Sequence, residues 1–159
     1  MARPERAESP SGTVVAVFQK LLDRFRRRQP KQVSNKDILR ISYEPRANGK
    51  AEPGEVVWTW VPYREDPNQG KDRPVLVIGT LGDRLAALTL TSKDHSDHPD
   101  CVPLGSGGWD PQRRPSYVRV DKVLRVKPDA VRREGSALDK DRFDTVVAEF
   151  RRYHQMHPR

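Results

Sequence analysis

The chain has 159 residues, of which 35% are hydrophobic and 33% charged, and its formal net charge is +8. This length fits one domain, or one domain with an appendage, and the apolar runs fall well short of the about 20 residues that cross a bilayer. The single cysteine, Cys101, excludes an internal disulfide framework, and without a recognisable secretion signal the chain is expected in the cytoplasm.

The positive charge favours a polyanionic partner, either nucleic acid or an acidic protein, and an arginine-rich surface without that role is the alternative. Residues 1–10 are expected to be a disordered leader, and residues 11–52 a helical extension with a linker. Apolar residues recur at three- and four-residue spacing between Val14 and Phe25, which predicts a helix from Ser11 to about Arg28. Arginines crowd its last turn, where they suit the helix dipole or hold phosphates. A short helical turn is expected near residues 35–40.

From Gly54 onward the pattern changes to short strands between turns. In the first strand, Val57, Thr59 and Val61 alternate with bulky residues, so we expect both of its sides to be covered. A last helix, capped by Asp139, carries an apolar stripe and closes the pattern. Many short, closely spaced strands predict a mainly β, α+β fold, a small barrel with a C-terminal helix and an extra N-terminal helix. The predicted strands are 55–61, 75–78, 85–91, 102–104, 117–120 and 124–126.

Four sequence pieces occur in an order that is informative as a set. They are "PGEVVWTWVPY" (residues 53–63), "NQGKDRPVLVIG" (68–79), "LTLTSK" (88–93) and "SYVRVDKVLRV" (116–126). In this order they resemble the PemK/MazF family, the ribonuclease halves of bacterial toxin–antitoxin pairs. The resemblance covers residues 53–154 and leaves residues 155–159 as a tail.

The resemblance implies an SH3-like barrel of the PemK/MazF/CcdB type that forms a homodimer. It also implies cleavage of single-stranded RNA without a metal ion or other cofactor, and inhibition by a small acidic antitoxin. Arg73 stands where the family has its active-site arginine and Thr91 where it has its catalytic threonine, with Ser92 as the neighbouring candidate. Asn68 and Leu124 depart from the family pattern, where a glutamate and an arginine are common.

RNA carries its own nucleophile, the 2′-hydroxyl, so its cleavage needs a fixed cation and proton carriers rather than a metal. The guanidinium of Arg73 is suited to phosphate because its donors form a planar fork that stays charged. Pro74 restrains Arg73 to an extended backbone, which predicts a rigid strand entrance below a loop over residues 63–72. The alternative is that Arg73 forms a surface ion pair with Glu65, Asp66 or Asp72.

Further candidates flank these residues. His95 and His98 are possible acid–base groups; with Asp94, Asp97 and Asp100 they are alternatively a divalent metal site or a solvated loop. Trp109 is expected either to stack on an RNA base or to plug the barrel mouth or a dimer seam. The predicted RNA contacts are Gln69, Lys71, Lys93, Trp109, Arg113 and Arg114.

The leading hypothesis is therefore an endoribonuclease that acts as the toxin of a type II toxin–antitoxin pair. A barrel that binds RNA or DNA without cutting it is the first alternative, motivated by the two departures from the family pattern. A toxin of the same fold that attacks DNA gyrase is the second.

Overall fold

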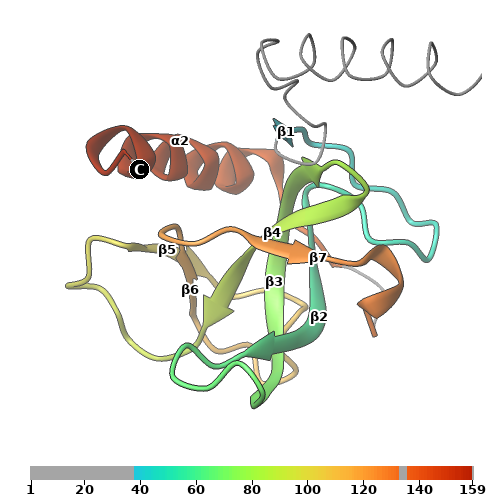
Figure 1. Ribbon diagram of the computed structural model, residues 1–159, viewed down its shortest axis with the longest axis horizontal. Helices are drawn as coiled ribbons and strands as arrows, with labels where there is room; N and C mark the ends of the chain where they lie inside the picture. The colour runs from blue at the N-terminus through green and yellow to red at the C-terminus, as the bar shows by residue number, and fades with distance from the viewer. Residues whose placement is uncertain (1–37, 133–135, 159) are drawn as a thin grey trace, which may run out of the picture. The chain divides into compact units, whose positions relative to one another are not determined.

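The computed structural model of the protein describes residues 38–132 and 136–158 (Figure 1). The predicted leader and the predicted helix at residues 11–28 lie outside this range, and the predicted domain limits stay predictions. The described strands are β1 (Leu39–Ile41), β2 (Glu55–Pro62), β3 (Gly70–Leu81), β4 (Arg84–Thr91), β5 (Cys101–Gly105), β6 (Ser116–Arg119), β7 (Leu124–Val126) and β8 (Ser136–Ala137). The described helices are the short 3-10 helix η2 (Pro128–Ala130) and the α-helix α2 (Lys140–Met156).

The described strands form one curled antiparallel sheet in the order β5-β6-β4-β3-β2-β8. β1 adds to β3 at its far end, and β7 adds to β4, so the two longest central strands each pair with several partners along their length. A register shift in the β3–β4 pairing between Val77 and Gly79 adds local twist to the sheet. The result is a half-barrel with a C-terminal helix, which confirms the mainly β class expected from the strand pattern.

The two faces of the sheet each carry a separate core cluster. Val56 of β2 packs in the larger cluster, together with the apolar face of α2, whereas Val57 and Val61 pack in a smaller cluster with residues of β3, β4 and β7. Alternation along a strand sends successive side chains to opposite faces. The prediction that β2 is covered on both sides is confirmed at these positions.

The helix α2 begins where the sequence predicts. Asp139 caps it by accepting a hydrogen bond from the Arg142 N–H at 3.1 Å, and Phe143 lies with its ring centroid 5.0 Å from that of Tyr43. Figure 1 shows the helix, in red, lying along one side of the curled sheet. Within residues 38–132 and 136–158, no helix is both long and apolar enough to cross a membrane. The buried residues of α2 are Phe143, Val146, Val147 and Phe150.

The helical turn predicted near residues 35–40 is wrong for its described part, because Leu39–Ile41 form the strand β1. The reason lies in a residue far along the chain. A Cβ on Gly79 would lie 1.9 Å from the Arg40 carbonyl oxygen, so only glycine lets the β1 backbone come this close. Pairing with β3 therefore overrides the local preference of the segment.

We expect Phe143→Ala to lower the free energy of unfolding by about 3–5 kcal/mol, because it removes a ring from the interface of α2 with the sheet. Urea unfolding followed by circular dichroism measures the effect. Arg151→Ala, on the exposed side of the same helix, is the matched control and should change stability by less than about 0.5 kcal/mol. Equal effects of the two substitutions would show that α2 does not contribute to the core.

Cys101, at the start of β5, should react slowly with thiol reagents. Burial, followed by the neighbouring Asp100 carboxylate, raises the pKa of its thiol to about 11. At pH 8 the reactive thiolate is then about 100-fold rarer than in an unperturbed cysteine. Iodoacetamide alkylation at pH 8, measured by mass spectrometry, should speed up by roughly this factor when urea unfolds the protein. Similar rates in the folded and unfolded states would contradict the burial of this thiol.

Candidate functional site

The candidate site lies where the pairing between β3 and β4 ends. The last β3–β4 pair on this side is Val75 opposite Thr89, and from Leu90 onward β4 pairs with β6 instead. Two residues beyond the last pair, Arg73 and Thr91 stand on either side of an opening between the strands. We call Arg73, Thr91 and Lys93 the notch.

Arg73 and Pro74 lie inside β3, not at its entrance as predicted, because β3 begins at Gly70. Arg73 is opposite Thr59 and Pro74 opposite Trp58. The Trp58 carbonyl accepts a hydrogen bond from the Arg132 N–H and thus points away from β3. In an antiparallel ladder the Trp58–Pro74 pair is then not hydrogen-bonded. The nitrogen of Pro74 faces the side that β4 has left, so no ladder bond is lost.

The Arg73 guanidinium forms no ion pair with any carboxylate of the described residues, which contradicts the alternative of a surface salt bridge. Asp72 pairs with Arg132 at 2.9 Å, and Asp66 accepts a hydrogen bond from the Asn68 N–H at 3.0 Å. Glu65 does line the same pocket as Arg73, but it lies beyond the 4 Å limit of an ion pair. The charge of Arg73 therefore remains available to a ligand.

Two pockets meet at the notch, and all three notch residues line both. The larger has a volume of about 280 Å³ and the smaller about 140 Å³. By strand alternation, the larger lies on the face of the smaller core cluster, and the smaller pocket, with Trp58, Pro74 and Leu90, lies on the opposite face. The larger pocket is further lined by Val61, Pro62, Tyr63, Arg64, Glu65, Thr89, His95, Arg119, Asp121, Lys122 and Leu124.

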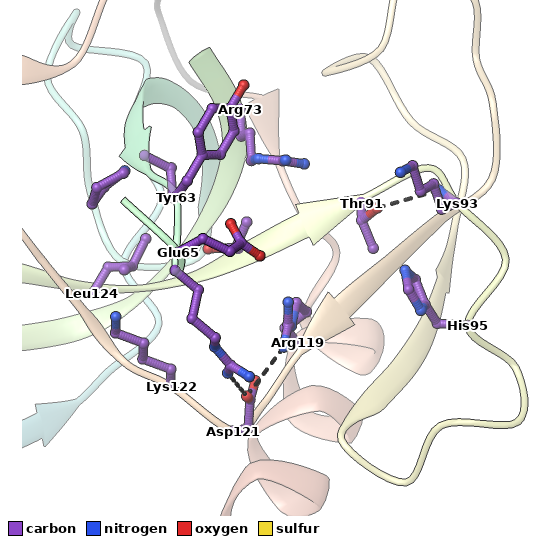
Figure 2. A pocket seen from close by; sticks show the side chains of 14 residues that line it. Tyr63, Glu65, Arg73, Thr91, Lys93, His95, Arg119, Asp121, Lys122 and Leu124 are labelled. Atoms are coloured by element: carbon purple, nitrogen blue, oxygen red, sulfur yellow. Dashed lines mark hydrogen bonds and ion pairs between the residues drawn. The ribbon is translucent and has the colours of Figure 1, made fainter. Parts of the chain in front are cut away.

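Basic side chains outnumber carboxylates in the larger pocket, and Asp121 pairs with two of them. Its Oδ2 accepts hydrogen bonds from Arg64 at 2.9 Å and Arg119 at 3.2 Å (Figure 2). This network ties the β2–β3 loop to the end of β6. Arg73, Lys93 and Lys122 form no ion pair within the part of the chain that the structure describes, so the pocket stays positive.

The hydroxyl of Thr91 is oriented by its own turn. Its oxygen accepts a hydrogen bond from the Lys93 N–H at 3.3 Å, which leaves the hydroxyl proton to donate elsewhere. Ser92, the neighbouring candidate, is exposed and lines only the smaller pocket. The geometry therefore favours Thr91 over Ser92 as the group beside Arg73.

The structure separates the two candidate histidines. His95 lines the larger pocket, and Figure 2 shows it across the opening from Arg73. The side chain of His98 is 56% exposed and lines neither pocket. Among the described residues, no three His, Cys, Asp or Glu side chains gather as a metal site would need, so the alternative of a metal bound by this loop has no support.

The loop that carries His95 is anchored through Asp94. Hydrogen bonds from Ser96, then one from Tyr117, hold the pKa of Asp94 below its ordinary value, and the bond to Asp94 raises the pKa of Tyr117. The Tyr117 ring meets the His95 ring edge to face, with 6.5 Å between centroids. These contacts place the His95 side chain at the pocket, which a freely solvated loop would not do.

Trp109 is a core residue with 4% of its surface exposed. Its indole N–H donates to the Ser116 hydroxyl at 3.0 Å, and Arg142 lies over its ring at 5.6 Å. A Cβ on Gly107 would lie 2.0 Å from the same ring. This burial favours the predicted plug of the barrel mouth. Trp109 also lines the smaller pocket, so its predicted contact with an RNA base stays a prediction.

The remaining predicted contacts are divided between the smaller pocket and the surface. Lys71 and Arg114 line the smaller pocket, whereas Gln69 and Arg113 are exposed and line neither pocket. Leu124, which stands where the family commonly has an arginine, lines the larger pocket.

The charged residues of the larger pocket that the sequence did not indicate as site residues are Arg64, Glu65, Arg119, Asp121 and Lys122. A signal existed for Asp121, which lies in the matching piece "SYVRVDKVLRV". Arg119 lies in the same piece, but no signal placed it or Glu65 at the notch, because only the curl of the sheet brings the end of β6 and the β2–β3 loop there.

Comparison with known families places this geometry in context. Residues 52–154 match the family model described as PemK-like, MazF-like toxin of type II toxin–antitoxin system. A search among curated proteins found no match. The matched segment contains the notch and both pockets, and it spans well over half of the chain. The protein therefore belongs to the PemK-like, MazF-like family of toxins of type II toxin–antitoxin systems.

Proposed function

We propose that this protein is a metal-independent endoribonuclease that cleaves single-stranded RNA and acts as the toxin of its toxin–antitoxin pair. The observation that carries this proposal is the notch, where an arginine that has no ion-pair partner among the described residues lies across from a threonine hydroxyl at the edge of a positive pocket. A polyanion is the ligand class that such a pocket attracts.

In the proposed reaction, the 2′-oxygen of the RNA attacks the adjacent phosphorus while the bond to the 5′-oxygen of the next nucleotide breaks. The products are a 2′,3′-cyclic phosphate and a free 5′-hydroxyl. Arg73 stabilises the charge that develops on the phosphate oxygens. The Thr91 hydroxyl donates to one of these oxygens, and Lys93 adds positive charge beside them.

The reaction also requires that a proton leave the 2′-hydroxyl and another reach the departing 5′-oxygen. We assign both transfers to His95, which lines the pocket with Arg73. Its ring takes the proton of the 2′-hydroxyl and gives a proton to the departing 5′-oxygen, so that no net proton is taken up. Glu65 is the other group in the pocket that is suited to accept the first proton.

The partners belong to the same proposal. As a type II toxin, the protein has an antitoxin as its partner, and the net charge of +8 supports a small acidic one. We further propose that the half-barrel is the family's SH3-like barrel, that it assembles as a homodimer, and that it acts in the cytoplasm. The second candidate function is a barrel that binds nucleic acid without cutting it. The observation that favours it is Leu124, which lines the larger pocket where the family commonly has an arginine.

We expect Arg73→Ala to lower the cleavage rate of single-stranded RNA by about 10²–10³-fold, because it removes a preorganised donor to the transition state. The assay uses purified full-length protein, labelled RNA and EDTA, with identification of cyclic phosphate and 5′-hydroxyl ends. Arg151→Ala removes the same charge far from the notch and should cleave like the wild type.

The assay also separates the rival functions. Binding of RNA without cleavage by the wild type would indicate the non-catalytic barrel. Inhibition of DNA gyrase with the RNA intact would indicate the gyrase-directed toxin. Cleavage that Arg73→Ala leaves unchanged would place the active site elsewhere.

We expect His95→Gln to lower the cleavage rate by about 10²–10⁴-fold, because it removes the proposed proton carrier. His98→Gln is the matched control, since this residue lies in the same loop but outside the pocket, and its cleavage rate should match that of the wild type. If Glu65→Gln has the large effect and His95→Gln does not, the glutamate is the base and the assignment to His95 is wrong.

A further inference from the structure

We infer that the smaller pocket is a nucleobase subsite that takes a guanine or a cytosine next to the cleaved linkage, with Arg114 reading the base and Asp110 positioning Arg114. The inference rests on the proposed function, because it assumes a nucleic-acid strand at the notch. It adds a binding site and a specificity-determining residue on the opposite face of the sheet from the larger pocket.

The first argument is the arrangement of the pockets. A cleaved RNA linkage has one nucleotide on each side, and the notch has one pocket on each side. Arg73, Thr91 and Lys93 line both pockets, so a phosphate held at the notch has a pocket within reach of each neighbouring nucleotide. The larger pocket accommodates one of them and leaves the smaller for the other.

The second argument is the size and lining of the smaller pocket. Its volume of about 140 Å³ is below the about 300–1,000 Å³ typical of sites for drug-sized molecules, so it suits one planar ring system. Apolar groups of Trp58, Pro74 and Leu90 form part of its lining. A phosphate gains nothing from such walls, whereas a base buries its faces against them.

The third argument is the state of Arg114. Asp110 is 6% exposed, and its Oδ2 accepts a hydrogen bond from the Arg114 Nε at 2.9 Å. Its Oδ1 accepts one from the Gln112 N–H at 2.9 Å. The pair with Arg114 is the main reason that the pKa of Asp110 lies below its ordinary value, so Asp110 stays charged at neutral pH and fixes one edge of the guanidinium.

The other edge of Arg114 remains for a ligand. Its two Nη groups form no hydrogen bond to the described residues, and they present two donors side by side. An unpaired guanine offers two adjacent acceptors, O6 and N7, and an unpaired cytosine offers N3 and O2, so both match such a pair of donors. Adenine and uracil have no two adjacent acceptors. This matching selects guanine or cytosine against adenine and uracil.

The backbone next to Arg114 supports a built site. Arg113 has a φ of +51°, a left-handed conformation that is uncommon for a residue with a side chain. This turn brings the chain back so that Arg114 meets Asp110 four residues earlier. Arg113 itself is exposed and lines neither pocket, which makes it a control of equal charge at the next position.

The experiment measures binding without cleavage. The probes are fluorescein-labelled 2′-O-methyl oligouridylates, whose blocked 2′-oxygen cannot attack, with a single G, A, C or U at the centre. Full-length wild type should bind the G and C probes more tightly than the A and U probes by fluorescence anisotropy. Arg114→Ala should weaken binding of the preferred probes about 5- to 100-fold and leave the A and U probes within about 3-fold. Arg113→Ala should weaken all four probes alike.

Each other outcome is decisive. Equal affinities of the wild type for the four probes, or matching effects of the two arginine substitutions, would overturn the subsite. A larger but uniform loss with Arg114→Ala would identify a phosphate contact instead of a base contact. The subsite and the proposed nuclease activity can be rejected independently. RNA cleavage in EDTA by a protein that does not discriminate between the four probes rejects only the subsite. Discrimination between the probes by a protein that does not cleave RNA rejects only the nuclease.

Asp110→Asn tests the positioning role while keeping the shape of the side chain. It should reduce the preference for the G and C probes in the same direction as Arg114→Ala, with the urea midpoint measured to exclude unfolding. Unchanged preference in a folded Asp110→Asn protein would show that Asp110 does not position Arg114.

Discussion

The structure of the site depends on one event in the sheet, the departure of β4 from β3 after the Val75–Thr89 pair. If the ladder continued, Arg73 and Thr91 would be ordinary cross-strand neighbours on a closed surface. Because β4 turns to pair with β6, the same two residues border an opening with a pocket on each face. Pro74 fits this place because its backbone nitrogen faces the side where no strand remains to accept a hydrogen bond.

Two carboxylates near the opening form ion pairs with some of the arginines there and leave Arg73 to contact a ligand. Asp121 holds Arg64 and Arg119 and so ties the β2–β3 loop to β6, while Asp110 holds one edge of Arg114. Arg73 has no such partner among the described residues. A positive pocket is costly to the folded state unless a counter-charge is near, and this cost is expected where a protein is built to bind a polyanion.

Local pattern predicted most elements, because alternation and capping act between near neighbours. Asp139 begins α2 as expected, and β7 covers the three residues that its apolar alternation indicated. The local pattern failed where a contact with a distant segment determined the secondary structure. β1 forms because Gly79 admits the Arg40 backbone. β3 begins as early as Gly70 because β2 pairs with it from Leu76 back to Gly70.

The sequence by itself determined the family, and it predicted the chemistry of the candidate groups with Arg73 and Thr91 among them, since these follow from residue types in order along the chain. Tertiary structure alone decided which groups meet. It placed His95 at the pocket and His98 outside it, buried Trp109, and brought Arg119 to a pocket that its own segment does not suggest. The physical reason is that strand pairing and curl join residues far apart in the chain, and no local spacing encodes those distances.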